Sequence, residues 1–276
     1  LAVRSYAPGD GNYACLNMIP EVTLRGVVTE ESLGFELGGR IDVPGANFYV
    51  RRTADNSIVA GILDAVTRGS QTTLRLYPDQ DPGQLAVRND APPPDYQIVL
   101  KGGVSGLRST TGGIVATDAV CDTLTTADLV DGLRAGDCVI NFDTVDNAQD
   151  DQCKISHFEI EPVAPMFTCA RDNCEGDTEP LVGGHQRVFE AFPINRAGQR
   201  AVVNSQVTWS SSDESVLLSA SPFSLALTGL QKEFEIRPVN GSTNISAAAD
   251  IDGADVSGST EARVFLCANP WPPDMA

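Results

Sequence analysis

Short runs of alternating apolar and polar residues fill this sequence, and Gly, Pro, Asn and Asp interrupt them about every eight to fifteen residues. Helical periodicity is nearly absent. Because side chains alternate between the two faces of a strand, this pattern predicts an all-β protein built from β-sandwiches. The strands expected in the first half are 22–28, 47–52, 57–63, 72–77, 96–101 and 138–145. Those expected in the second half are 155–162, 187–193, 206–210, 215–218, 224–228, 233–238, 244–249 and 261–267.

The length of 276 residues suits two domains, since domains usually have roughly 100–150 residues. A polar run at 147–152 has no apolar anchor and is the expected junction. We therefore predict sandwiches at 20–146 and 153–267, with a Pro-rich tail or linker at 268–276. The first sandwich carries a short helical insertion at 126–134, which Thr125 is placed to cap. Residues 1–19 form either an N-terminal arm that pairs with a neighbouring subunit or a disordered terminus.

The charge balance narrows the function classes. The chain has 19 basic and 37 acidic residues, which gives a formal net charge of -18. Such an acidic protein does not bind nucleic acid through a basic face. No stretch approaches 18 continuous apolar residues, so no membrane-spanning segment is expected. The chain begins at Leu1 without a basic or apolar leader, and we expect it to be processed or excised from a longer protein.

Both halves resemble bacterial Ig-like surface domains. In the first, Asn47-Phe48-Tyr49-Val50, Ile58-Val59-Ala60-Gly61 and the segments 72–78, 96–100 and 106–113 are similar to Ig-like domains of S-layer proteins. In the second, 181–184, 189–191 and above all Val207-Thr208-Trp209-Ser210-Ser211-Ser212-Asp213 resemble group 2 bacterial Ig-like domains of intimin-type and invasin-type adhesins. The resemblance implies two tandem Ig-like β-sandwiches in a structural or adhesive surface module without catalysis. The cysteines, the helical insertion and the segment 166–180 depart from the common patterns.

Trp209 follows Val207 on the same face of its expected strand. A large aromatic side chain in this position usually fills the space between the two sheets of a sandwich. We therefore predict that Trp209 is a core residue. Trp271, which lies between prolines, is either a linker wedge or an exposed ring for a sugar or a neighbouring domain.

Seven cysteines, none in a C-x-x-C pair, indicate disulfides formed in an oxidising compartment, which places the protein outside the cell. Cys121 and Cys138 flank the expected helix and are placed to staple it. Cys169 and Cys174 either close their own small loop or one of them pairs with Cys267, because the last strand of an Ig sandwich runs parallel to the first. Cys15 is then a candidate for an intermolecular bond.

Few residues offer other chemistry. His157 and His185 are the only histidines, there is no G-x-S-x-G motif, and no catalytic residue is assigned. Zinc at His157, Cys169, Cys174 and His185 is disfavoured because the spacing lacks tight ligand pairs. Calcium at the junction is the one cofactor that the sequence leaves open, although a solvated loop is the favoured interpretation. Its candidate ligands are Asp143, Asp146, Asp150 and Asp151.

The sequence thus predicts an extracellular structural module of a bacterial surface protein, S-layer or filament, which acts as a stiff spacer and self-association unit. Its expected partners are other copies or neighbouring domains of a longer chain. The alternative is an adhesin module whose loops bind a carbohydrate or a receptor. A hydrolase that uses His157 or His185 is a third, weaker hypothesis.

Overall fold

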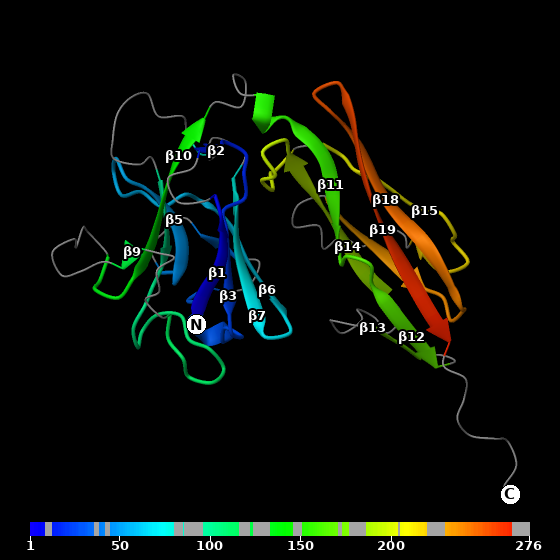
Figure 1. Ribbon diagram of the computed structural model, residues 1–276, viewed down its shortest axis with the longest axis horizontal. Helices are drawn as coiled ribbons and strands as arrows, with labels where there is room; N and C mark the ends of the chain where they lie inside the picture. The colour runs from blue at the N-terminus through cyan, green and yellow to red at the C-terminus, as the bar shows by residue number, and fades with distance from the viewer. Residues whose placement is uncertain are drawn as a thin grey trace, which may run out of the picture. The chain divides into compact units, whose positions relative to one another are not determined.

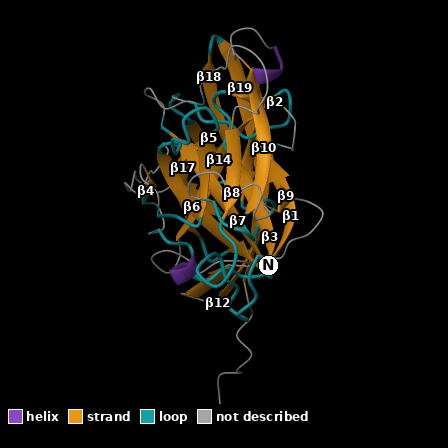
Figure 2. Cartoon of the chain, turned by 90° about the vertical axis from the view of Figure 1, so that its left-hand side faces the viewer, coloured by secondary structure: helices purple, strands orange, loops and turns teal. Residues whose placement is uncertain are grey.

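The computed structural model describes residues 1–8, 13–35, 39–41, 45–79, 85, 96–115, 122–123, 133–145, 151–170, 173–176, 186–203, 205–219 and 230–266. Strands dominate these residues, and helical structure within them is confined to the short 3-10 turns Glu30–Ser32 and Asp151–Cys153 (Figures 1 and 2). The predicted all-β class is confirmed. No helix in this described part has the length and apolar character needed to span a bilayer.

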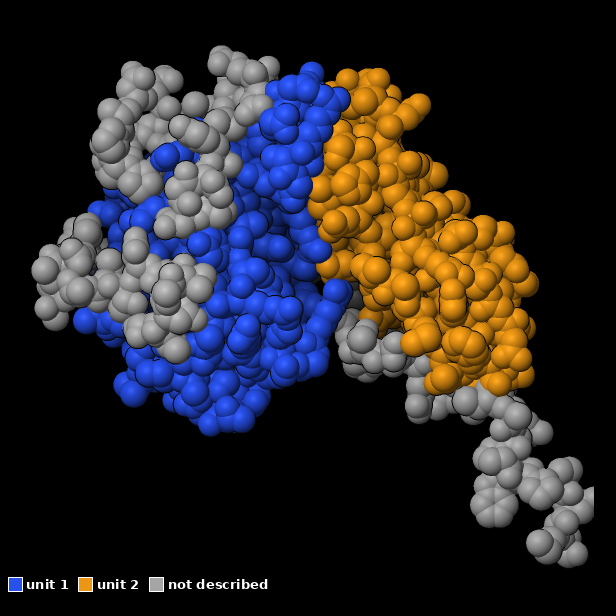
Figure 3. Space-filling view, viewed as in Figure 1, with its two compact units in different colours: residues 1–154, 195–202 blue, residues 155–194, 203–276 orange. Residues whose placement is uncertain are grey.

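The chain divides into two compact units, which are coloured separately in Figure 3. Unit 1 contains residues 1–154 and 195–202, and unit 2 contains residues 155–194 and 203–276. Each unit has two sheets that enclose an apolar cluster of its own. The protein therefore consists of two β-sandwiches, as the alternation predicts.

Unit 1 pairs a five-stranded sheet with a second sheet of four strands and a short added strand. The order in the first sheet is β1 (Ala2–Ala7), β3 (Glu21–Arg25), β7 (Gln71–Pro78), β6 (Gly61–Arg68) and β4 (Arg40–Ile41). The order in the second is β2 (Tyr13–Cys15), β10 (Cys138–Val145), β8 (Tyr96–Leu100) and β5 (Phe48–Arg52), with β9 (Asp122–Thr123) also paired to β10. β2 and β10 run parallel, and the other paired strands are antiparallel.

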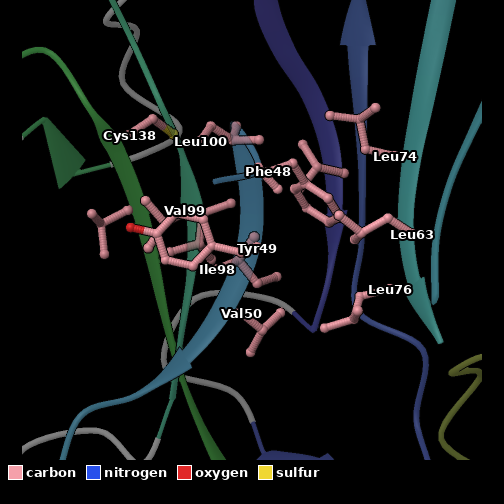
Figure 4. Packing of buried hydrophobic residues seen from close by; sticks show 14 of the residues in the cluster. Phe48, Tyr49, Val50, Leu63, Leu74, Leu76, Ile98, Val99, Leu100 and Cys138 are labelled. Carbon is pink, nitrogen blue, oxygen red and sulfur yellow. The ribbon is translucent and has the colours of Figure 1, made fainter. Parts of the chain in front are cut away.

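The core of unit 1 lies between these sheets. Figure 4 shows Phe48 of β5 directed toward Leu63 and Leu74 of the opposite sheet. Phe48 and Leu63 are fully buried, and burying such a side chain stabilises the folded state by about 1.5–3 kcal/mol. The strand alternation places Tyr49, between Phe48 and Val50, on the other face of β5. Tyr49 therefore lies on the opposite face of β5 from Phe48, where it is also buried.

Unit 2 has a four-stranded and a five-stranded sheet. The first contains β11 (Ile155–Glu161), β14 (Gln186–Asn195), β17 (Gln231–Ile236) and β16 (Leu217–Ser219) in that order. The second contains β13 (Asn173–Gly176), β12 (Met166–Ala170), β19 (Ala254–Leu266), β18 (Gly241–Ile251) and β15 (Thr208–Ser211). β12 and β19 run parallel.

Aromatic rings fill the core of unit 2. The ring centroids of Phe189 and Phe234 are 5.4 Å apart, and Trp209 meets Phe234 edge-on at 6.2 Å. Trp209 is half-buried and packs against the buried cluster. Gly258 of β19 closes the sandwich, because a Cβ at this position would collide with the backbone carbonyl oxygen of Phe158 on β11. A glycine is thus required where the two sheets approach each other.

Two segments that the sequence pattern left outside the sandwiches are strands. The N-terminal residues do not form a free arm, because β1 pairs with β3 and β2 pairs with β10. The segment 166–180 contains β12 and β13 rather than a simple insertion. The last strand, β19, pairs in parallel with β12 and also packs against β11, the strand at 155–161. The expected strand at 57–63 begins later, at Gly61, and runs to Arg68.

Unit 1 also contains a segment from far along the chain. Residues 195–202 belong to unit 1, although β14 before them and β15 after them belong to unit 2. The expected boundary of the second domain at residue 153 therefore does not hold, since unit 1 continues to Lys154 and takes in this segment. The expected strand 224–228 and nearly all of the expected helix 126–134 lie outside the described residues.

Candidate functional site

A pocket of about 310 Å³ opens beside the second sheet of unit 1. Its wall is formed by β5, by the residues that follow β8 and by the turn that precedes β10. The side chains that give it chemical character are Asn47, Tyr49, Arg51, Asn56, Lys101, Ser105, Arg134 and Asp137. The volume is at the lower end of the range of roughly 300–1,000 Å³ that is usual for small-molecule sites.

Strand alternation puts Tyr49 and Arg51 on the pocket side of β5. Their neighbours Phe48 and Val50 face the core, and in Figure 4 the Tyr49 side chain lies away from Leu63 and Leu74. Arg51 is opposite Gln97 on β8, and its Nε donates to Gln97 Oε1 at 2.8 Å. The register between the strands therefore fixes where the cation lies.

Gln97 continues this row of polar side chains across the sheet. It is opposite Asn141 of β10, and its Nε2 donates to Asn141 Oδ1 at 2.8 Å. Three neighbouring strands thus each supply one member of the row. Because side chains in such a network hold one another in place, we expect the orientation of Arg51 to be well defined.

Asp137 organises the other wall of the pocket. This carboxylate is 2% exposed, and it accepts hydrogen bonds from Lys101 Nζ at 3.2 Å and from the backbone N–H groups of Gly102 and Arg134 at 2.9 Å each. The bonds tie the end of β8 to the turn before β10. Gly102 allows this close approach, because a Cβ there would collide with the carbonyl oxygen of Gly136.

The pocket differs in charge from the rest of the molecule. Among the described residues that line it are three cations and one carboxylate, whereas the whole chain carries -18. Burial lowers the pKa of the Arg51 guanidinium, an effect that the nearby Tyr49 hydroxyl partly offsets. Lys101 Nζ lies 5.6 Å from the centre of the Tyr49 ring, a distance at which a cation is attracted to the ring face.

Arg134 lies at the exposed rim of the pocket. Its Nη1 donates to the Ser105 hydroxyl at 3.4 Å. On the same side, Asn47 Nδ2 donates to the backbone oxygens of Ser32 at 2.8 Å and Ser105 at 3.3 Å. These bonds connect the rim to the loop that follows β8.

The structure does not bring together those proposed calcium ligands that it describes. Asp143 lies within β10, and Asp151 pairs with Lys154 and Arg196. Asp146 and Asp150 lie outside the described part, in which no three His, Cys, Asp or Glu side chains form a metal-binding group. The hydrogen bond from Lys154, which has the largest effect, and the charge of Arg196 lower the pKa of the Asp151 carboxylate.

The cysteines show a bond that the spacing did not predict. Cys15 is bonded to Cys153 of the same chain, with Cα atoms 5.5 Å apart, so the expected intermolecular role of Cys15 is wrong for this structure. β2 brings Cys15 to the end of β10, close to the 3-10 turn that carries Cys153. The spacing of the cysteines does not reveal such a pairing, since the two positions are 138 residues apart in the sequence.

The other predicted cysteines are described in part. Cys138 and Cys169 are both disulfide-bonded, and Cys169 is directly opposite Cys174 in the β12–β13 pairing. Cys121 and Cys267 lie outside the described residues. Because Cys169 is oxidised, it has no thiolate to offer to the disfavoured zinc site.

His157 lies in no recognisable catalytic group within the described part of the chain. His157 is exposed on β11, and its Nδ1 lies 2.9 Å from the hydroxyl of the adjacent Ser156. His185 and Trp271 lie outside the described residues. The pocket residues were not predicted from the sequence, although Tyr49 and Arg51 alternate with Phe48 and Val50, which is the available signal for a second, chemically different face of that strand.

Comparisons with known proteins give weak structural similarity. No family model matches the sequence, and no curated protein matches it. Among solved structures, S-layer protein SbsC aligns at 13% identity and a TM-score of 0.30, over 96% of this chain and 41% of that one. A tandem of titin Ig domains aligns at 8% identity and 0.24, over 96% and 98% of the two chains. Tandem Ig repeats of Dlar align at 12% and 0.22, over 94% of each.

The chain thus spans about two fifths of the S-layer structure that it matches. Scores this low carry no argument about function, and the assignment as two β-sandwiches rests on the sheets themselves. The similarity of residues 153–267 to group 2 Ig-like domains stays a prediction.

Proposed function

We propose that this chain is an extracellular structural module that bears tension within a surface layer or filament, without catalysis. The observation that supports the proposal is the disulfide between Cys15 and Cys153, which encloses most of unit 1. Extracellular structures that bear load benefit from folds that do not lengthen irreversibly. The disulfide limits how far the first sandwich can lengthen, because it is a covalent link across the fold.

A force applied at the two ends of the chain would pass through this disulfide. The backbone between the two cysteines spans 138 positions, and a covalent bond across their side chains removes that stretch from the load path. Only the residues up to Cys15, which include β1 and β2, and those after Cys153 remain in the path. The folded strands β3 to β10 are therefore shielded from the pull.

Oxidation of the described cysteines supports an extracellular site of action. All four cysteines whose side chains the structure describes are bonded, namely Cys15, Cys138, Cys153 and Cys169. Disulfides of this kind persist in oxidising compartments and are rare in the reducing cytosol.

Single-molecule stretching of the whole chain, held at its two ends, tests the proposal. The oxidised protein is expected to release the length of unit 2 and the first residues of unit 1. Replacing Cys15 and Cys153 by serine together should add up to roughly 480 Å, because 138 extended residues span about 3.5 Å each. The bond at Cys138 is left intact in this variant and shortens the gain if its partner also lies within the enclosed stretch.

The matched control is the single variant Cys15→Ser, which removes the same disulfide. With its Cys153 thiol capped by a thiol-blocking reagent, this variant should show the same gain in extended length. If the oxidised wild-type chain and the double variant extend to equal lengths, the disulfide does not shield unit 1 and the load-bearing proposal fails.

A further inference from the structure

We propose that the pocket beside β5 binds a monosaccharide-sized ligand that carries a carboxylate, such as a uronic acid. The inference goes beyond the mechanical role, and it rests on a different part of unit 1. The observations that carry it are the charge of the pocket, the fixed position of its cations and the mixture of ring and amide groups in its wall.

The pocket is set up for an anion. Asp137 is the one carboxylate among the lining residues that the structure describes, and this group is already engaged by Lys101 and two backbone N–H groups. The positive charges of Arg51, Lys101 and Arg134 therefore outweigh it within the lining. In a partly buried pocket these charges interact more strongly with an anion than they would in water.

Arginine is well suited to bind the carboxylate of such a ligand. A guanidinium is planar and offers parallel N–H donors, which match the two oxygens of a carboxylate. Arg134 lies at the exposed rim, where it can turn toward a ligand without breaking the interior, since its described contact is the 3.4 Å bond to Ser105.

The remaining lining suits the rest of a sugar. Tyr49 contributes part of its largely buried ring to the wall, and Asn47, Asn56 and Ser105 provide amide and hydroxyl groups that pair with the hydroxyls of a sugar. The volume of about 310 Å³ admits a small ligand rather than a chain of several units. A carboxylated sugar uses the cations, the ring and the polar groups together, whereas a bare inorganic anion uses the cations alone.

Binding of D-glucuronate to the oxidised full-length chain, followed by NMR chemical shifts, tests this inference. Glucuronate is expected to shift the signals of Tyr49 and Arg134 with saturation, and glucose, which lacks the carboxylate, is expected to bind at least about tenfold more weakly. Inorganic phosphate serves as the second comparison. If phosphate shifts the same signals at equal or lower concentration, the pocket is a general anion site and the inference is overturned.

Two variants that each remove one positive charge make the test more specific. Arg134→Gln removes a rim cation and should weaken glucuronate binding about tenfold, while Arg4→Gln removes an exposed cation on β1, outside the pocket, and should leave it unchanged. If both variants weaken glucuronate binding equally, the effect comes from the net charge of the molecule and the inference is overturned. No saturable shift with glucuronate overturns it as well, and neither outcome bears on the stretching experiment.

Discussion

Trp209 shows how a single side chain links a sequence motif to the core of unit 2. It lies within the motif Val207–Asp213, packs edge-on to Phe234 and is half-buried. Its indole Nε1 is buried and has no hydrogen-bond partner within the described residues. The ring thus contributes through apolar contact rather than through its N–H.

We expect Trp209→Ala to lower the free energy of unfolding of unit 2 by about 2 kcal/mol, roughly half the cost of removing a fully buried aromatic ring. Trp209→Phe keeps most of the contact and should cost less than about 1 kcal/mol. Chemical denaturation followed by circular dichroism measures both. If the phenylalanine variant is as unstable as the alanine variant, the indole N–H has a structural role that these contacts do not explain.

The remainder of the same motif forms a turn that the sequence alone does not explain. Asp213 N donates to Thr243 Oγ1 at 2.8 Å, and the Ser215 N–H and hydroxyl both bond to Asp213 Oδ1. The bond from the Ser215 hydroxyl, which has the largest effect, and the bond from the Ser215 N–H lower the pKa of the Asp213 carboxylate. Thr243 lies on β18, thirty residues along the chain, so a local motif acquires its shape from a distant strand.

At the scale of elements, the segment 195–202 is the clearest example of non-local structure. Backbone bonds join Ile19 N to Arg200 O at 2.8 Å and Val202 N to Asn17 O at 2.6 Å. The side chain of Asn195, which is 1% exposed, accepts from Gln199 N at 2.8 Å and donates to Gln199 Oε1 at 3.1 Å. Gln199 Oε1 also accepts from Cys15 N at 3.2 Å.

Asn195→Ala should therefore loosen this segment and destabilise unit 1 by about 1–3 kcal/mol, because it removes the side-chain oxygen that accepts from the half-buried Gln199 N–H. Hydrogen exchange at Ile19 and Val202, whose amides bond across the segment, should become faster. Asn244→Ala, at an exposed position of β18, is the matched control and should change neither amide. Unchanged exchange at Ile19 in the Asn195 variant would show that the segment is held by other bonds.

The alternation of apolar and polar residues identified the strands that have one buried face and one polar face. The strand at Cys138–Val145 has the predicted bounds, β7 is longer than predicted by one residue at each end, and β8 ends one residue earlier than predicted. The strands β12 and β13 were missed because a short hairpin with cysteines offers little alternation to read. The pocket was missed for a related reason, since Lys101 and Arg134 come together only through Asp137 and the fold.

At the scale of the whole molecule, charge opposes the self-association that the sequence predicts. The net charge of -18 repels other copies, and the range of this repulsion falls from about 10 Å at 0.1 M salt to about 3 Å at 1 M. Strand β15 is at the edge of its sheet in unit 2, and an edge strand offers unpaired backbone groups to a neighbour. The expected association therefore depends on how far the charge is screened.

Sedimentation velocity over a range of protein and NaCl concentrations should show a sedimentation coefficient that rises with both, because salt removes the repulsion between acidic copies before it weakens apolar and backbone contacts. CaCl₂ and MgCl₂ at matched ionic strength separate screening from a specific site. A greater effect of calcium would indicate a specific calcium site, and equal effects would indicate screening alone. A particle that stays monomeric at high salt and high protein concentration would contradict self-association, while leaving the tension-bearing role of the Cys15–Cys153 bond to be decided by stretching.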